Sequence, residues 1–441
     1  IPTFAHHLRA GGYQTALVGK MHFVGADQLH GFEDRLTTDI YPADFGWTPN
    51  WNDPDGRFDW WFHNMDSVVN AGVVDVSNQL DFDDDVGYRS VRKLRDLARS
   101  ADDRPWMMTA SFTHPHDPYV ARQEFWDLYE HDTIPMPTTP PIDGTDPDVE
   151  LDPHSARLRR VICADSTDIS ADQIRTARHA YLANISYVDH HIGQMLDVLN
   201  THDMVDDTIV IFTADHGDML GERGLWYKMS FFEHSARIPL IVTRLGDLSD
   251  GSSPGVRAPA GDSPAQAWPT HVGAHTSLLD IAPTMLDIAG IDVPTEMDGR
   301  SVLPLLTAPE NERTVLGEYL GEGAVAPIFM IRRGDLKFIW SRPDGAQLYD
   351  LSNDTAELHN LVGSLEHADV VADFTAEVFT RWDVDAIDAD VRASQRARGL
   401  VDRALRQGRF EAWDHVPVVD ATNQYMRNHL DLNDVESSRR A

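Results

Sequence analysis

The sequence is poor in the residues on which several common kinds of protein depend. It contains one cysteine, Cys163, in 441 residues, which excludes an internal disulfide framework and a metal site built from several cysteines. No apolar run reaches the roughly 18 residues that a membrane-spanning helix needs. Basic residues are also few: 37 Lys and Arg stand against 71 Asp and Glu, and the net charge of −34 argues against nucleic acid as a partner.

The charged residues that are present have an unusual composition. Aspartate outnumbers glutamate by 55 to 16, and arginine outnumbers lysine by 33 to 4. The acids are spread along the chain instead of being gathered in a tail, and concentrated salt would screen their mutual repulsion. We therefore expect a cytoplasmic protein of a salt-loving cell, with a GC-rich genome as the alternative explanation. The four lysines are Lys20, Lys93, Lys228 and Lys337.

The order of apolar runs predicts the architecture. Strand-like runs alternate with helix-like segments up to residue 305, which predicts an α/β domain (1–305) with a largely parallel sheet covered by helices on both faces. The expected strands are 15–20, 106–112, 208–215 and 238–244, and the expected helices are 1–10, 89–100, 170–199 and 276–290. Residues 306–441 predict a smaller α+β domain with an antiparallel hairpin turning at Gly334 and Asp335, then a helix and a polar tail. The Pro-rich stretch 131–153 predicts a lid or a binding loop.

Polar clusters follow three of the expected strands, where the sites of α/β proteins lie. The clusters are GKMHF with Lys20 and His22, THPHDPY with His116, and ADHGDMLGERGLWYK with Asp215, His216 and Lys228. The carboxylate and imidazole of the third cluster suit a hard divalent cation, the lysines suit anionic oxygens, and the histidines suit proton transfer near neutral pH. Each feature alone is more often a turn, a cap or solvated surface. Together they predict a metal-assisted site for a tetrahedral oxyanion such as sulfate or phosphate.

The same motifs carry a family resemblance. GKMHF, PHDP and DHGDMLGE followed by WYK, in this order, resemble the sulfatase branch of the alkaline-phosphatase-like hydrolases. The longer strings MHFVGADQLHGFEDRLTTDIYPADFGW and ERGLWYKMSFFEHSARIPLI are similar to choline-sulfatases, as are GEYLGEGAVAPIFMIRRG and NQYMRNHLDL. The resemblance implies a mixed sheet flanked by helices, hydrolysis of choline sulfate in a route to glycine betaine, and a divalent metal, with Ca²⁺ as the expected ion.

The resemblance also assigns roles to residues. It makes Asp215 and His216 metal ligands, places Lys20, His116 and Lys228 around the sulfate oxygens, and puts His22 beside the nucleophile. That nucleophile, in sulfatases, is a formylglycine made within a Cys-x-Pro-x-Arg or Ser-x-Pro-x-Arg motif, and the sequence has neither. Cys163 stands in the wrong context, before Ala164. We therefore expect the formylglycine in an N-terminal segment upstream of Ile1, and we expect the chain as given not to hydrolyse sulfate esters by that mechanism.

An aromatic-rich loop supplies the expected seat for the choline part of the substrate. A quaternary ammonium has no N–H to donate, so aromatic faces and carboxylates should hold it. Four tryptophans lie within 15 residues, and His63 and Asn64 follow them: Trp47, Trp51, Trp60 and Trp61. The resemblance favours Trp47, His63 and Asn64 as substrate-binding residues and Glu318 as the balancing carboxylate. Asp218 and Glu222 are expected to serve their own loop.

The resemblance further implies a homodimer or homotetramer, with Asp420, Asn423 and Tyr425 of the tail as candidate contacts between subunits. The run of arginines after residue 380 is expected to be a solvated helical face. Two other functions stay open on the sequence. One is a phosphodiesterase or phosphonate monoester hydrolase of the same superfamily. The other is a non-catalytic protein that binds quaternary ammonium compounds.

Overall fold

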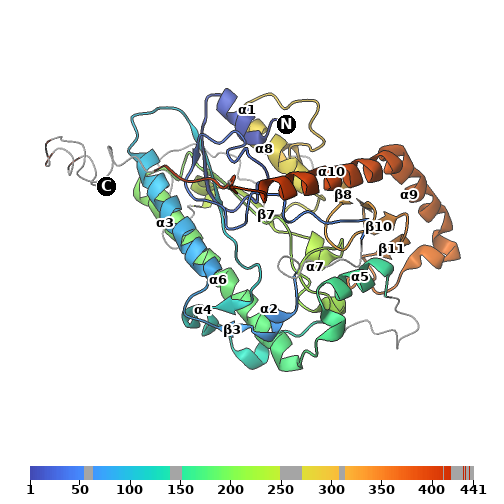
Figure 1. Ribbon diagram of the computed structural model, residues 1–441. Helices are drawn as coiled ribbons and strands as arrows, with labels where there is room; N and C mark the ends of the chain where they lie inside the picture. The colour runs from blue at the N-terminus through green and yellow to red at the C-terminus, as the bar shows by residue number, and fades with distance from the viewer. Residues whose placement is uncertain are drawn as a thin grey trace.

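The computed structural model describes residues 1–53, 63–139, 151–248, 271–306, 313–410 and 412–418, together with the single residues 431, 433 and 437. The strand predicted at 15–20 is β1 (Gln14–Gly19), and its apolar residues are fully buried. It pairs in parallel with β2 (Asp34–Arg35) on one side and with β4 (Trp106–Ser111) on the other (Figure 1). The parallel arrangement brings the carboxyl ends of β1 and β4 to one edge of the sheet.

The strands predicted at 208–215 and 238–244 are present as β6 (Ile209–Thr213) and β7 (Leu240–Arg244), but they do not extend this sheet. In the described part of the chain they form an antiparallel pair of their own. A further short pair, β3 (Gly72–Val73) with β5 (Val120–Ala121), is parallel. The prediction of one largely parallel sheet is therefore wrong, because β7 returns directly alongside β6. The mixed α/β character is confirmed.

Two long helices pack along each other beside the sheet, α3 (Asn78–Ala98) and α6 (Ala171–Thr201) (Figure 1). Ser170 begins α6, because its side chain accepts from the backbone of Gln173 and the Gln173 side chain accepts from the Ser170 backbone. The remaining helices before residue 306 are α1 (Phe4–Ala10), α2 (Asp66–Val69), α4 (Gln123–Trp126), α5 (Pro153–Val161), α7 (Glu233–Ala236) and α8 (Ile281–Ile288). The predicted helices 1–10, 170–199 and 276–290 are thus confirmed, and 89–100 is the second half of α3.

Single-turn 3₁₀ helices connect these elements. They are His131–Thr133, Ala164–Ser166, Glu222–Gly224, Leu245–Leu248, Leu278–Asp280, Leu303–Leu306, Leu361–Gly363 and Leu365–His367. Residues 140–150 of the expected lid lie outside the described residues. The part of that stretch before residue 140 is joined to the loop that follows β6 (residues 214–224, the DHG loop), because the backbone N–H groups of Thr138 and Thr139 donate to the carboxylate of Glu222.

A second sheet lies in the C-terminal part of the chain. Its order is β11-β10-β9-β8, all antiparallel, and the strands are β8 (Thr314–Tyr319), β9 (Ile328–Arg333), β10 (Leu336–Ser341) and β11 (Gly345–Asp350). The hairpin predicted at Gly334 and Asp335 is confirmed, and Gly334 supplies the positive φ of +54° that the turn needs. Strand β11 was not expected. Helix α9 (Ala368–Arg381) covers the sheet, with Phe374 stacked on Phe338 at 5.4 Å between ring centroids.

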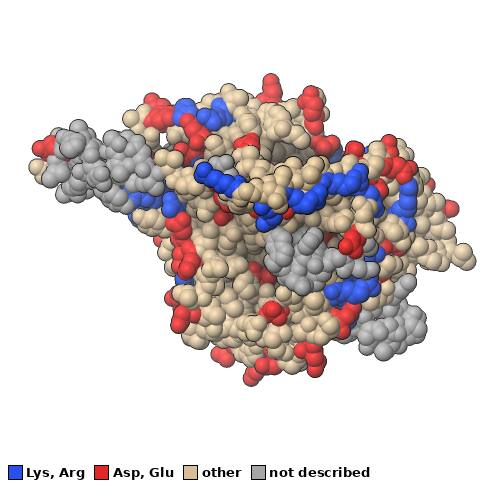
Figure 2. Space-filling view, in the orientation of Figure 1, with Lys and Arg blue, Asp and Glu red and all other residues tan. Residues whose placement is uncertain are grey.

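Helix α10 (Val384–Leu405) carries most of the arginine run, and Figure 2 shows a basic band along it on a surface otherwise dotted with acids. Neighbouring acids on the helix bind some of these arginines, as Asp388 binds Arg392 at 2.8 Å. Arg396 and Arg403 are exposed, but Arg392 also donates to Asn52 and to the carbonyl of Val325, so the expected solvated face is confirmed only in part. Among the described residues, no helix is both long and apolar enough to cross a membrane. The domain boundary at 305/306 stays a prediction.

Candidate active site

The loops that follow β1, β4 and β6 converge. Lys20 Nζ lies 3.3 Å from Asp215 Oδ2, so the first and third predicted clusters meet. The amine of Lys228 donates to His116 Nε2, and the His116 and His216 rings are 5.8 Å apart, which joins the second cluster to the third. The structure thus brings all of the predicted catalytic and metal-ligating side chains to one place.

Glycine at the end of β1 makes this convergence possible. Gly19 has a φ of +107°, and a Cβ at this position would lie 1.9 Å from the carbonyl oxygen of Ser111 at the end of β4. Any side chain would force the two strand ends apart. The close approach sets Lys20, the next residue, at the sheet edge that His116 also reaches.

A buried ion pair fixes the loop that carries His22. Asp39 Oδ2 accepts from the backbone N–H groups of Met21 at 3.0 Å and His22 at 2.8 Å, and from Arg35 Nη2 at 3.0 Å. These bonds hold His22 at a φ of +51°. Burial lowers the pKa of His22 below its usual value and outweighs the nearby Asp39, which raises it, so the imidazole is neutral at pH 7. Asp39 and Arg35 were missed from the sequence, where their spacing carries no distinctive signal.

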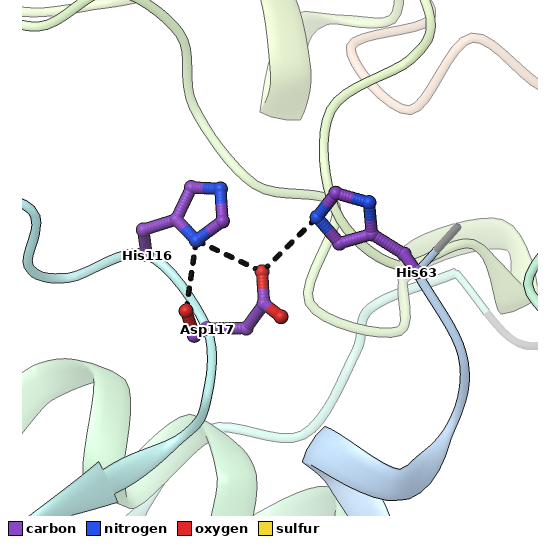
Figure 3. A group of neighbouring side chains, drawn as sticks. All are labelled: His63, His116 and Asp117. Carbon is purple, nitrogen blue, oxygen red and sulfur yellow. Dashed lines mark hydrogen bonds and ion pairs between the residues drawn. The ribbon is translucent and has the colours of Figure 1, made fainter. Parts of the chain in front are cut away.

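His63, His116 and Asp117 form the centre of the site (Figure 3). The Asp117 carboxylate lies between the two imidazoles, with Oδ1 3.0 Å from His116 Nδ1 and 3.4 Å from His63 Nε2. Burial raises the pKa of Asp117, but the two histidines outweigh it and hold this pKa well below its usual range. The three donor atoms are close enough for a metal ion, but the amine of Lys228 already faces both rings, 3.3 Å from His63 Nε2. The group is therefore best understood as a hydrogen-bonded array in which the neighbours of each imidazole determine which of its ring nitrogens carries a proton.

Asp215 and His216 have the chemistry of metal ligands. His216 Nδ1–H donates to the carbonyl of Gly217 at 2.7 Å, which leaves the Nε2 lone pair facing Asp215 Oδ2 at 3.5 Å. Burial lowers the pKa of His216 to about 4. Burial opposes ionisation of Asp215, but Lys20 and His216 lower its pKa to about 2. A neutral imidazole and an ionised carboxylate side by side fit a divalent cation, and these two donors would form part of its ligand set.

An aromatic wall stands next to this group. The Trp47 ring lies 5.4 Å from His22 and 5.2 Å from Tyr41. Tyr41, which the sequence analysis did not select, also lies 4.8 Å from His22 and has Lys20 Nζ 5.7 Å from its ring centroid. Trp51 is buried elsewhere, where its Nε1–H donates to the carbonyl of Gly321. Trp60 and Trp61 lie outside the described residues.

Of the remaining predicted substrate-binding residues, one lies in the central group and two lie outside it. His63 joins the central group, whereas Asn64 Oδ1 accepts from the backbone of Asp66 at 2.8 Å and so serves the start of α2. The structure does not bring Glu318 to the group: its side chain, on the exposed side of β8, accepts from Trp382 Nε1 at 2.7 Å. Strand alternation turns it away from the site.

Glu322 takes the position expected for Glu318. Its Oε2 lies 3.7 Å from His63 Nδ1. Burial lowers the pKa of His63, but its interactions with Asp117 and Glu322 outweigh burial and raise this pKa above the usual value. The motif GEYLGEG contains both glutamates, and only the end of β8 at Tyr319 distinguishes them.

Asp218 and Glu222 serve their loop, as the sequence indicates. Asp218 accepts from the backbone of Leu220 and Tyr227 and from the hydroxyl of Tyr119. Burial raises the pKa of Asp218 to about 6. Glu222 binds the 138–139 backbone. Both carboxylates hold the segment that leads to Lys228 in place.

Comparison with known families identifies the class of protein that this fold and site define. The Sulfatase family matches residues 1–291, and the chain belongs to the sulfatase family, which places it among the sulfuric ester hydrolases. Two C-terminal families also match: N-sulphoglucosamine sulphohydrolase, C-terminal, over residues 264–382, and Choline sulfatase enzyme C terminal, over residues 389–440. Within the family, the chain is 47% identical to the choline-sulfatase of Rhizobium meliloti (strain 1021), over 100% of this chain and 83% of that protein. The resemblance read from the motifs is confirmed.

Solved structures share the fold. A phosphonate monoester hydrolase of Agrobacterium radiobacter has a TM-score of 0.61 at 19% identity, covering 89% of this chain and 80% of that one. A 2-O GAG sulfatase has a TM-score of 0.56 at 20% identity, covering 90% of this chain and 76% of that one. The expected sulfatase-type α/β fold is confirmed, and at these identities the likeness concerns the fold alone.

Proposed function

We propose that the protein hydrolyses choline sulfate to choline and sulfate. The observation that carries the proposal is the placement of two amines, Lys20 and Lys228, beside the aromatic wall of Tyr41 and Trp47. The first pair suits a sulfate group and the second suits a quaternary ammonium. The choline-sulfatase of Rhizobium meliloti, to which the chain is 47% identical, bears a name that supports the same substrate.

The anionic half of the substrate binds at the lysines. Lys20 and Lys228 reach the group from different loops, so their ammonium groups can contact different sulfate oxygens. Both side chains are largely withdrawn from water, which strengthens their attraction for an anion. Asp215 and His216 would hold a divalent cation, with Ca²⁺ as the expected ion. When bound there, the cation supplies Lewis-acid polarisation of a sulfate oxygen.

The cationic half of the substrate binds at the aromatic wall. The faces of Trp47 and Tyr41 attract a trimethylammonium group through their negative quadrupoles, and Glu322 adds a carboxylate on the His63 side of the group. This arrangement favours choline sulfate over an uncharged aryl ester. A phosphate diester without a cationic group would gain nothing from a seat for a cation.

Proton transfer to the leaving alcohol is assigned to His116 with Lys228. His116 Nδ1–H donates to the carbonyl of Asp117 at 2.8 Å, so its Nε2 is the basic nitrogen and accepts from the Lys228 amine. Burial, followed by Lys228, lowers the pKa of His116 and keeps the ring neutral until a proton is passed through Nε2. The neutral His22 also borders Tyr41, at 4.8 Å between ring centroids, and can accept a proton there.

The residues present do not fit the formylglycine nucleophile. Cys163 lies in the turn after α5 with a φ of +62°, and its carbonyl accepts from Ser166 and Thr167. It is followed by Ala164 and not by the motif that the modification needs. A homodimer or homotetramer and a cytoplasmic location in a salt-loving cell remain part of the proposal, and Asp420, Asn423 and Tyr425 lie outside the described residues.

The test compares two chains and two substrates. The 441-residue chain and the product of the complete reading frame, with any codons upstream of Ile1, are assayed for sulfate release from choline sulfate and from 4-nitrophenyl sulfate. We expect release by the longer product and only binding by the 441-residue chain. Trp47→Ala should weaken the binding of choline sulfate about tenfold and the binding of 4-nitrophenyl sulfate hardly at all. Equal losses on both esters would refute the aromatic seat. A longer product that binds choline without hydrolysing its sulfate would leave only the non-catalytic function.

A further inference from the structure

Lysine is so scarce in this chain that each one invites an explanation. Lys20 and Lys228 belong to the site, and Lys93 pairs with Asp34 at 2.6 Å with 16% of its side chain exposed. Lys337, on β10 of the C-terminal sheet, is 1% exposed. Although the chain has 33 arginines and only four lysines, the cation at this interior position is a lysine. Burying a cation is costly unless its hydrogen bonds are satisfied.

The surroundings of Lys337 need a single nitrogen with converging acceptors. Its Nζ lies 2.8 Å from the carbonyl oxygen of Phe231, 2.8 Å from Glu357 Oε1 and 2.6 Å from Glu233 Oε1. An ammonium has three N–H donors on one atom, and here it finds three oxygens. The planar guanidinium of arginine spreads its donors over three nitrogens and cannot converge on these oxygens in the same space.

Two of the acceptors, Phe231 and Glu233, lie on the segment that leads from Lys228 into α7, and the third, Glu357, lies in the loop after β11. Glu357 also accepts the backbone N–H of Glu233 at 2.7 Å, so the first residue of α7 is held by both members of the pair. Ser235, within α7, donates from its hydroxyl to the carbonyl of Lys228. The Ser235 carbonyl accepts the backbone N–H of Gly217 at 2.7 Å. Helix α7 therefore contacts both the backbone of Lys228 and the DHG loop.

We propose that Lys337 is a positioning residue that sets the separation between the Lys228 amine and the DHG loop by holding α7 against the C-terminal sheet. Figure 1 shows α7 beside that sheet. The catalytic consequence of the proposal rests on the proposed function, but the positioning itself does not. Since Lys337 touches none of the groups expected to meet the substrate, its effect passes through Phe231, Glu233 and Ser235.

The four lysines also provide the readout. Lysine labelled with ¹³C at Cε gives four side-chain signals, which single Lys→Arg substitutions assign. Lys337→Arg keeps the charge and removes the convergence, and Lys93→Arg is the matched control in a partly buried pair away from α7. We expect Lys337→Arg to move the Lys228 signal while Lys93→Arg leaves it in place. Ser235→Ala, a milder change that removes the bond to the Lys228 carbonyl, should move the same signal and keeps the test decisive if Lys337→Arg fails to fold.

Affinity for inorganic sulfate, measured by calorimetry on the same variants of the 441-residue chain, gives the functional side. A displaced Lys228 should weaken sulfate binding roughly ten- to a hundredfold in Lys337→Arg, with Lys93→Arg unchanged. An unmoved Lys228 signal in both Lys337→Arg and Ser235→Ala would overturn the positioning role, even if the parent chain binds sulfate well. A moved signal in a parent chain that binds no sulfate would retain the positioning role and count against the proposed function.

Discussion

The loop that carries His116 and Asp117 depends on the buried carboxylate of Asp83, which has no assigned role in the reaction itself. Asp83, on α3, is 0% exposed and accepts from the backbone N–H groups of Thr113 at 2.8 Å and His114 at 2.9 Å. Its Oδ2 also lies 2.6 Å from His114 Nδ1. Three donors of one loop therefore converge on one side chain, two and three residues before the histidine that faces Lys228.

Replacing Asp83 by Ala leaves all three donors buried without an acceptor. A buried donor that loses its partner costs about 1–3 kcal/mol, and more where the partner was a charged group. Because the bonds share one acceptor and the loop can relax, we expect Asp83→Ala to lower the free energy of unfolding by about 3–5 kcal/mol. Asp83→Asn keeps the volume and one oxygen but turns an N–H₂ group toward a donor, so its loss should be about half as large.

Urea titration measures the loss, with Asp81→Ala as the matched control. Asp81 is an exposed acid in the first turn of the same helix, and its removal should cost no more than about 1 kcal/mol through the helix dipole. Sulfate affinity of the folded fraction should fall in Asp83→Ala, because His116 loses its anchor, and should be unchanged in Asp81→Ala. If the two variants unfold at urea concentrations that differ by less than their error, the loop does not depend on Asp83.

Three other changes test separate parts of the structure. Gly19→Ala should destabilise the protein by about 2 kcal/mol or more in a thermal scan, since its Cβ would lie 1.9 Å from Ser111 O at a positive φ; an unchanged melting temperature would refute the close approach. Burial lowers the pKa of His154, so as the pH falls below about 6.5 the unfolded chain binds this proton before the folded chain does, and the free energy of unfolding decreases. His154→Gln should therefore reduce the drop in urea midpoint between pH 7.5 and pH 5.5. An identical drop in the variant and the parent chain would contradict this. Asp215→Asn should weaken calcium binding measured by calorimetry at least about tenfold, and equal affinity would remove Asp215 from the ligand set.

The sequence was informative about the residues that follow strands and less so about their supports. Lys20 and His116 were predictable neighbours because β1 and β4 are apolar, parallel and adjacent, so that their ends share an edge. Asp39 holds the His22 loop from 17 residues away, and Asp83 holds the His116 loop from 30 away. Contacts at such separations leave no local periodicity, because a single side chain makes each one.

The errors have a similar origin. Alternating apolar runs report which face of a strand is buried but not which strand lies beside it, so β6 and β7 were recognised and their pairing was not. Glu318 and Glu322 share one motif, and the choice between them depends on where β8 ends. Asn64 was chosen for its position after the tryptophans, whereas an Asn two residues before a helix commonly binds the helix backbone.

The lysines explain how a protein with a net charge of −34 can hold a sulfate ester. Over distances beyond about 10 Å salt screens the surrounding acids, so the field at the site depends on the charges that the fold places there. Lys20 and Lys228 reach the site directly, and Lys337 holds the segment that carries one of them. The proposed substrate is a zwitterion, so the acidic surface does not repel it as it repels free sulfate. An acidic surface and a cationic cradle are therefore compatible, provided that the lysines are few, withdrawn from water and held in fixed positions.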